Sequence, residues 1–141
     1  MTLSKLPRPL AAVLILGLFL LGITACGVGG PSKAEQLSKE MQDAAMSVAG
    51  MQQADVHVIM NTSGNFITAK LTGTGSDQAS LAEALDKALP AMLEKTTALN
   101  NGSFAISIFS PDDSVSVGSR ALGYTGDSSL EEFREYFLNR P

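Results

Sequence analysis

The single histidine of the chain, His57, is the side chain best suited to moving protons near neutral pH. It lies between Val56 and Val58, so the sequence places it in the middle of a strand. Nucleophilic catalysis would require an activated serine, cysteine or threonine nearby, and the chain contains no Gly-x-Ser-x-Gly elbow. We therefore interpret His57 as an exposed or hydrogen-bonded strand residue, and we assign no catalytic residue.

Two adjacent acidic residues, Asp112 and Asp113, are the next candidates because carboxylates begin many calcium-binding loops. Such loops need further acidic or amide side chains at regular spacing, and none follow here. The run from Ser110 to Asp113 instead has the composition of a β-turn. The chain also lacks an HExxH motif, paired cysteine or histidine ligands and a Gly-Lys-Ser/Thr phosphate loop. We expect no metal, nucleotide or other cofactor.

Cys26, the only cysteine, follows an apolar N-terminal stretch. Lys5 and Arg8 come first, residues 10–21 carry no charge, and small residues precede the cysteine, which is the layout of a secretory leader. A transmembrane span remains open, but the apolar run is shorter than the roughly 20 residues that a bilayer core requires. A buried free cysteine also remains open, although it would leave the leader-like layout unexplained.

The run Ile23-Thr24-Ala25-Cys26 resembles the lipobox of bacterial lipoproteins. In that family a lipid transferase attaches diacylglycerol to the cysteine thiol, and cleavage leaves the cysteine as the first residue. The resemblance implies that residues 1–25 are a signal peptide and that Cys26 is lipidated. It also implies anchoring to the extracytoplasmic face of the cell membrane by palmitate-type chains. Isoleucine and threonine at the first two positions are mild departures from the family pattern. The resemblance predicts a cellular location and no activity.

The residues after the proposed cleavage site divide into a short tether and one domain. Two or three long acyl chains on one residue give a durable membrane anchor, whereas a single myristoyl-length chain binds only reversibly. Residues 26–31 are rich in glycine and would form a flexible tether. Residues 32–141 are enough for one domain with one hydrophobic core. No disulfide can support that core, because the chain has a single cysteine.

The charge of the predicted mature chain limits its partners. The leader holds two of the ten basic residues and none of the 14 acidic ones, which leaves 8 basic residues and a net charge of −6. Nucleic acids and anionic lipid surfaces both bind basic patches, so we expect no nucleic-acid partner. Besides the membrane, reached through lipid on Cys26, we expect a protein of the cell envelope as partner. The oligomeric state is not predicted.

Residues 32–72 predict a helix followed by a hairpin. Ser32 can cap a helix that extends to about residue 49 and has apolar residues at helical spacing. Residues 55–61 and 66–72 are rich in β-forming residues, and the Asn-Thr-Ser-Gly-Asn run between them has turn composition. The expected core side of the helix consists of Leu37, Met41, Ala44, Ala45 and Val48.

The rest of the chain predicts a second helix, a second hairpin and a final helix. Ser76 or Asp77 caps the second helix, and Pro90 is expected to kink or restart it. Residues 104–109 and 115–121 form the second hairpin across the Ser110 turn. Ser128 to Glu131 has the form of a capping box before the last helix. The apolar residues expected to face the core from these two helices are Leu81, Leu85, Ala88, Leu89, Met92, Leu130, Phe133, Phe137 and Leu138.

The element order, α-ββ-α-ββ-α, predicts an α+β fold with a four-stranded antiparallel sheet and helices on one face. A shift of 49 residues places Phe66 on Val115 and Leu89 on Leu138 without a gap, and a duplicated ββα unit would account for this alignment. The second face of such a sheet would meet solvent, a ligand or a partner.

Three functions remain open at this stage. The favoured one is a non-catalytic interaction or structural lipoprotein that uses the open sheet face or an edge strand. The alternative is a carrier of lipid or another apolar ligand, which would need a pocket on the order of a few hundred Å³. A small hydrolase is the third, and it would need His57 beside an acid and a hydroxyl nucleophile. Candidate lining residues for the carrier pocket are Phe66, Phe104, Phe109 and Met92.

Overall fold

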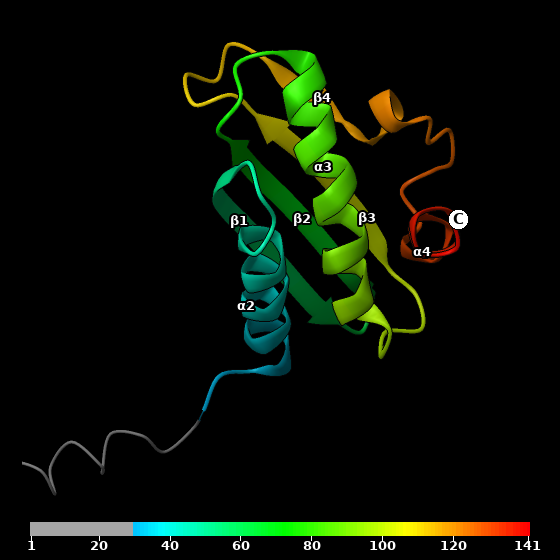
Figure 1. Cartoon of the computed structure of the whole chain (residues 1–141). Coiled ribbons are helices and arrows are strands. Elements are labelled where there is room, and N and C mark those ends of the chain that lie inside the picture. Colours follow the sequence, from blue (N-terminus) through cyan, green and yellow to red (C-terminus); the bar gives the residue numbers. More distant parts are fainter. Residues whose placement is uncertain (1–29) are drawn as a thin grey trace, which may run out of the picture. The chain divides into compact units, whose positions relative to one another are not determined.

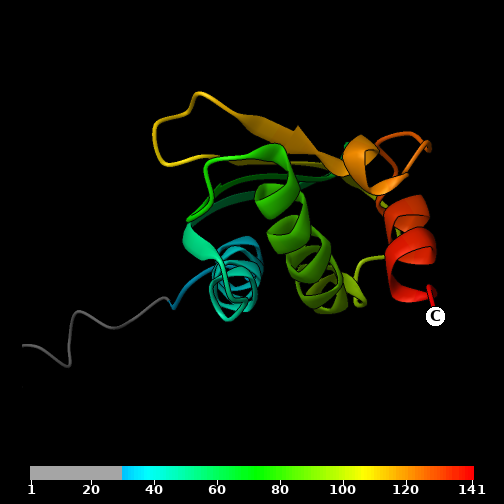
Figure 2. The same ribbon diagram turned by 45° about the horizontal axis from the view of Figure 1, so that its top comes forward.

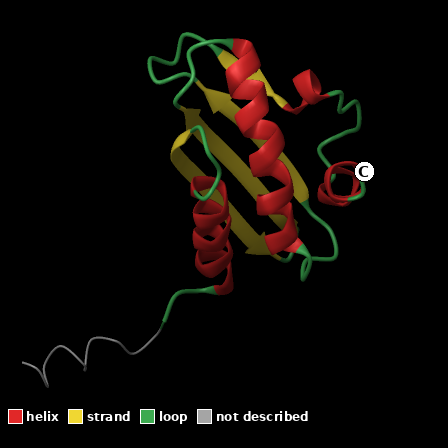
Figure 3. Cartoon of the chain, in the orientation of Figure 1, coloured by secondary structure: helices red, strands yellow, loops and turns green. Residues whose placement is uncertain are grey.

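The computed structural model describes residues 30–141, so the leader and Cys26 lie outside the described residues. Ser32–Pro141 forms a compact unit of three α-helices, two short 3₁₀ helices and one four-stranded sheet (Figures 1 and 3). The predicted α+β class is therefore confirmed for this unit. The strands lie in the sheet in chain order, from β1 to β4.

Helix α2, Lys33–Met46, starts at the predicted cap. The Ser32 hydroxyl accepts a hydrogen bond from the Glu35 N–H at 3.2 Å, and the Glu35 carboxylate accepts one from the Ser32 N–H at 3.3 Å. This capping box satisfies two backbone donors that the first turn leaves unpaired. The predicted face packs into the core through Leu37, Met41, Ala44 and Ala45, all of which are buried.

Strands β1, Met51–Asn61, and β2, Gly64–Gly73, form the first predicted hairpin. The two-residue turn between them is supported by a 2.8 Å bond from the Ser63 N–H to the Asn61 side-chain oxygen. Gly64 follows with φ of 139°, a conformation open to glycine at little steric cost. Buried and exposed residues alternate along β2, which is the pattern of a sheet with one covered face.

Helix α3, Gln78–Leu93, is capped by Asp77, whose carboxylate accepts from the Ser80 N–H at 2.7 Å. The helix continues through Pro90 and then tightens into the 3₁₀ helix η2, Glu94–Thr96. Of the two outcomes predicted at the proline, a kink or a restart, the restart does not occur. A proline removes one backbone donor, and seven buried residues on the same helix hold it against the core.

Strand β3, Ser103–Phe109, pairs parallel to β2, so the predicted all-antiparallel sheet is wrong and the sheet is mixed. The reason is the crossover through α3. Its sixteen residues rise about 24 Å and return the chain to the end of the sheet at which β2 began. A helix that runs back along the sheet makes the next strand parallel to the previous one.

The second hairpin is shorter than predicted. Strand β4, Ser116–Gly118, pairs antiparallel with β3 over three residues, and the chain then turns into the 3₁₀ helix η3, Ser119–Leu122. Helix α4, Leu130–Leu138, is capped by Ser129 rather than by the predicted Ser128. The Glu132 carboxylate accepts a hydrogen bond from the Asp127 N–H at 3.1 Å, so it stabilises the segment just before the helix.

The three helices lie on one side of the sheet, with α3 between α2 and α4 (Figures 1 and 2). On that side of the sheet, α2 packs against β1 and α3 packs against β3 and β4. Helix α4 contacts β3 and α3. The core fills the space between the helices and the sheet. Its most deeply buried large residues include Met41, Ile67, Leu71, Leu81, Leu85, Leu89, Met92, Leu93, Phe104, Ile108 and Leu130.

Candidate functional site

Within residues 30–141, nothing covers the side of the sheet that faces away from the helices, and we call it the open face (Figure 2). Alternation along the strands directs every second side chain to this side. The register aligns these side chains into rows that cross from β1 to β3. The open face consists of Asp55, His57 and Ile59 on β1, Phe66, Thr68 and Lys70 on β2, and Ala105, Ser107 and Phe109 on β3.

One end of the open face is apolar. Ile59 and Phe66 are directly opposite each other across β1 and β2, and they are 55% and 41% exposed. Only one other large hydrophobic side chain in the described part, Met46 on α2, is comparably exposed. Single exposed apolar residues are common on protein surfaces, but an adjacent pair forms a small contact patch. This pair makes the open face a candidate for binding.

The other end of the open face is polar. Asp55 lies opposite Lys70, whose ammonium is 3.9 Å from an Asp113 carboxylate oxygen and 4.9 Å from the centre of the Phe109 ring. A depression of about 210 Å³ lies here, formed by residues of β1, β2 and the β3–β4 loop. Its walls consist of Gln52, Gln53, Asp55, Lys70, Thr72, Pro111 and Asp113.

His57 lies between these two ends, exposed and opposite Thr68. Asp55 is on the same face two residues away, yet no hydrogen bond or ion pair joins the imidazole to Asp55 or Thr68 within residues 30–141. The acid, base and hydroxyl that a hydrolase would need are therefore close in register but unconnected. In the same described part, no group of three or more His, Cys, Asp or Glu side chains could hold a metal ion.

The predicted turn after β3 is confirmed, because the Asp113 N–H donates to the Ser110 carbonyl at 3.0 Å. The Asp112 carboxylate accepts from the hydroxyls of Ser110 and Ser114 at 2.8 and 2.7 Å. Hydrogen bonds from the Ser114 hydroxyl, the Ser110 hydroxyl and the Ser114 N–H lower the pKa of Asp112 to about 2. Asp112 therefore orders the turn as an anion.

The comparisons with family models, curated proteins and solved structures gave no significant match. The sheet edges are a second possible binding surface beside the open face. The Val56 carbonyl on edge strand β1 accepts from the Ser38 hydroxyl and, at 3.5 Å, from the Gln42 amide of α2. Helix α2 thus covers part of one edge, and the opposite edge strand, β4, has three residues. The short β4 offers little backbone for strand addition, whereas the eleven-residue β1 offers more.

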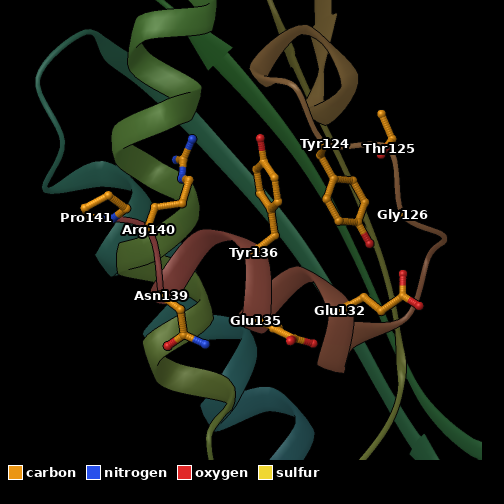
Figure 4. A pocket seen from close by; sticks show the side chains of 9 residues that line it. All are labelled: Tyr124, Thr125, Gly126, Glu132, Glu135, Tyr136, Asn139, Arg140 and Pro141. Carbon is orange, nitrogen blue, oxygen red and sulfur yellow. The ribbon is translucent and has the colours of Figure 1, made fainter.

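A second concave surface lies between residues 124–126 and α4, with a volume of about 530 Å³ (Figure 4). Its tyrosine hydroxyls are already bonded, since Tyr124 donates to the Asp127 carbonyl at 2.6 Å and Tyr136 donates to the Leu122 carbonyl at 3.1 Å. The Arg140 guanidinium likewise donates to Asp86 at 2.6 Å. These groups stabilise the local structure, and sequence reasoning assigned the surface no role.

Burial raises the pKa of Tyr124, and the nearby carboxylates of Glu132 and Asp127 raise it further. The phenol therefore stays protonated near neutral pH and acts as a hydrogen-bond donor. Its ring is 4.3 Å from that of Phe133 and 5.4 Å from that of Tyr136, centre to centre. Tyr124 is thus a packing residue between the segment before α4 and the helix itself.

The four residues predicted to line a carrier pocket lie on opposite sides of the sheet. Phe104 and Met92 are buried in the core below it, while Phe66 is exposed on the open face and Phe109 contacts Lys70 there. They do not line one cavity. No helix in the described part of the chain is long and apolar enough to cross a bilayer.

Proposed function

We propose that this chain is a membrane-anchored extracytoplasmic lipoprotein whose domain holds a protein partner through the open face and catalyses no reaction. The lipid would be carried by Cys26, in the leader-proximal part that the structure does not describe. The observation that carries the proposal is the exposed Ile59–Phe66 pair on a face that none of the described helices covers. The domain would then bind its partner close to the membrane.

The arrangement of the open face suits a protein partner better than a small ligand. Exposed aromatic and aliphatic side chains, with polar residues around them, are typical of contact surfaces between proteins. A carrier would enclose its ligand, whereas Ile59 and Phe66 are exposed on the surface of the sheet. The three-residue β4 is too short for strand addition, and Ser38 and Gln42 of α2 bond the Val56 carbonyl on the edge of β1, which favours contact through the side chains of the open face.

Photo-crosslinking in cells tests this role. A photoreactive phenylalanine analogue at position 66 is expected to crosslink the lipidated chain to one envelope protein. The same analogue at Met46, an exposed apolar position on α2, is the matched control and is expected not to do so. His57→Ala should leave the crosslink in place. Equal crosslinking from positions 66 and 46, or none from either, would contradict binding through the open face.

The anchor is tested separately. Mass spectrometry of membrane-extracted protein is expected to find a mature chain that begins at Cys26 and carries added acyl mass. Cys26→Ser should release the chain from the membrane or leave the precursor uncleaved. A native chain with an unmodified thiol would refute the anchor and leave the open-face proposal to be judged by crosslinking alone.

A further inference from the structure

The two ends of the open face differ in chemistry and are separated by a fixed distance. Ile59 and Asp55 are four residues apart on the same face of β1, which corresponds to about 13 Å at the rise of a strand. Between them lie His57 and Thr68, with Ala105 next to Thr68 on β3. A partner that spans this floor must therefore satisfy an apolar contact at one end and a polar contact at the other.

The polar end carries an uncompensated negative charge. Lys70 is drawn toward β3 by Asp113 and the Phe109 ring. Asp55, opposite Lys70 in the register, has no ion pair among the described residues. Two carboxylates thus face one ammonium around the 210 Å³ depression. A cation brought there would complete the pairing of Asp55, and an anion would be repelled.

We propose that the open face recognises a protein segment that places a large apolar side chain about 13 Å from a lysine or arginine. The apolar side chain packs on Ile59 and Phe66, and the cationic group binds at Asp55 in the depression. This inference rests on the proposed function and names the chemistry of its partner. The net charge of −6 predicted for the mature chain would steer such a cationic partner toward the domain.

A lipid surface is the competing occupant, because a lipid-anchored domain lies near one. The charges disfavour it: Asp55 and Asp113 would approach phosphate groups, and the face has Lys70 as its counter-charge. Juxtamembrane surfaces that bind anionic lipids carry clusters of lysine and arginine instead. The partner is therefore assigned to a basic protein segment.

A display library of random twelve-residue peptides, screened against the full chain in detergent, tests the assignment. We expect the enriched peptides to combine a large apolar residue with a lysine or arginine about four positions away in extended spacing. Phe66→Ser is expected to lower capture by about tenfold or more, since aromatic anchors dominate small interfaces. Met46→Ser, the matched loss of an exposed apolar side chain, should leave capture unchanged.

The charge preference has its own pair of variants. Asp55→Asn combined with Asp113→Asn leaves Lys70 alone at the polar end, so the enriched peptides should lose their basic residues. Asn tolerates the positive φ of 60° at position 113. Glu40→Gln combined with Glu94→Gln removes two exposed carboxylates elsewhere and should preserve the preference.

The outcomes separate the two proposals. Capture that survives Phe66→Ser contradicts binding through the open face altogether. Capture that depends on Phe66 but shows no basic preference, or the same preference in the Asp55/Asp113 variant, overturns only the cationic partner. Failure to enrich any peptide, with crosslinking of phosphatidylcholine from a photoreactive residue at position 66 but not from one at position 46 when the chain is held in vesicles, replaces the protein segment by a lipid surface. Failure to enrich any peptide without this lipid crosslink also overturns the inference.

Discussion

The first ββα half, from β1 to α3, and the second, from β3 to α4, have the same element order but very different sheets. Ten aligned residue pairs join β1 to β2, whereas three join β3 to β4. The helix of the first half has sixteen residues, seven of them buried, and that of the second has nine, three of them buried. A long strand ladder and a buried helix therefore define the first half.

The second half has fewer β-sheet pairs than the first. Packing of aromatic rings and hydrogen bonds from side chains to the backbone stabilise it instead. Its rings form a continuous series in which neighbouring centres are 4.3 to 6.0 Å apart. The Arg134 guanidinium donates to the carbonyls of Thr96 and Leu99 at 2.7 and 2.8 Å, which fastens α4 to the end of the first half. Two solutions to the same element order thus coexist in one core.

The largest effect should come from the buried helix of the first half. Leu85 on α3 has no exposed surface, so Leu85→Ala is expected to lower the free energy of unfolding by about 2–5 kcal/mol. Chemical denaturation followed by circular dichroism measures this. Ile59→Ser on the open face is the control and should change stability by roughly 0.5 kcal/mol or less, as at other surface sites. Comparable losses in both variants would mean that the open face is part of the core.

Local patterns in the sequence predicted helix α2 and most elements of the first half. The Ser32 cap, the first hairpin and the buried residues of α2 and α3 follow from neighbours a few positions apart. The parallel pairing of β3 does not follow from local patterns, because it depends on the end of the sheet to which α3 returns the chain. A sixteen-residue helix between strands is itself the signal that could have corrected this.

The second half was harder to predict because its key contacts are not local. Arg134 lies 38 residues from Thr96, and no spacing rule links them. Residues 119–121 were predicted as strand but lie in η3, a turn that Gly123 closes with φ of 87° and a backbone bond to the Arg120 carbonyl. For the candidate site, alternation predicted an uncovered sheet face, but the register that aligns Ile59 with Phe66 and Asp55 with Lys70 emerged only from the structure.

A smaller effect is expected at the fastening between the halves. Arg134→Met leaves the carbonyls of Thr96 and Leu99 without their guanidinium donor. Losing such bonds costs about 1–3 kcal/mol, and exchange of amide hydrogens should rise in α4 and residues 96–102 first. Arg140→Met, which removes the half-exposed pair with Asp86, is the control. Faster exchange in β1 and β2 of the Arg134 variant would show that the halves unfold together.

The hydrogen bond from α2 to the edge of β1 should have a still smaller effect on stability. Ser38→Ala removes a hydroxyl donor from the Val56 carbonyl, at a cost of about 0.5–1.5 kcal/mol in unfolding free energy. The freed edge could then pair with another chain, so light scattering should detect more association at high concentration. Ser47→Ala, which removes a hydroxyl bond within the end of α2, is the matched control. Association that rises equally in both variants would refute the edge role.

The turn after β3 should respond to pH more weakly. Hydrogen bonds from Ser114 and Ser110 lower the pKa of Asp112 from its ordinary 3.8 to about 2. A group whose pKa is lower in the folded state stabilises that state above its unfolded pKa. The contribution is therefore complete above about pH 4 and is lost as the pH falls through about 2. Because Asp112 is exposed, the change should stay within the turn.

Nuclear magnetic resonance can follow this loss at the amide of Ser114, which donates to the Asp112 carboxylate at 3.1 Å. Its chemical shift should change with a midpoint near pH 2, as the carboxylate takes up a proton. Asp112→Asn keeps an oxygen acceptor without the charge, so its turn should not titrate there. Asp113→Asn should leave the midpoint in place, because Asp113 takes no part in the Ser110 and Ser114 hydroxyl bonds. A midpoint near 3.8 would mean that these bonds do not form in solution.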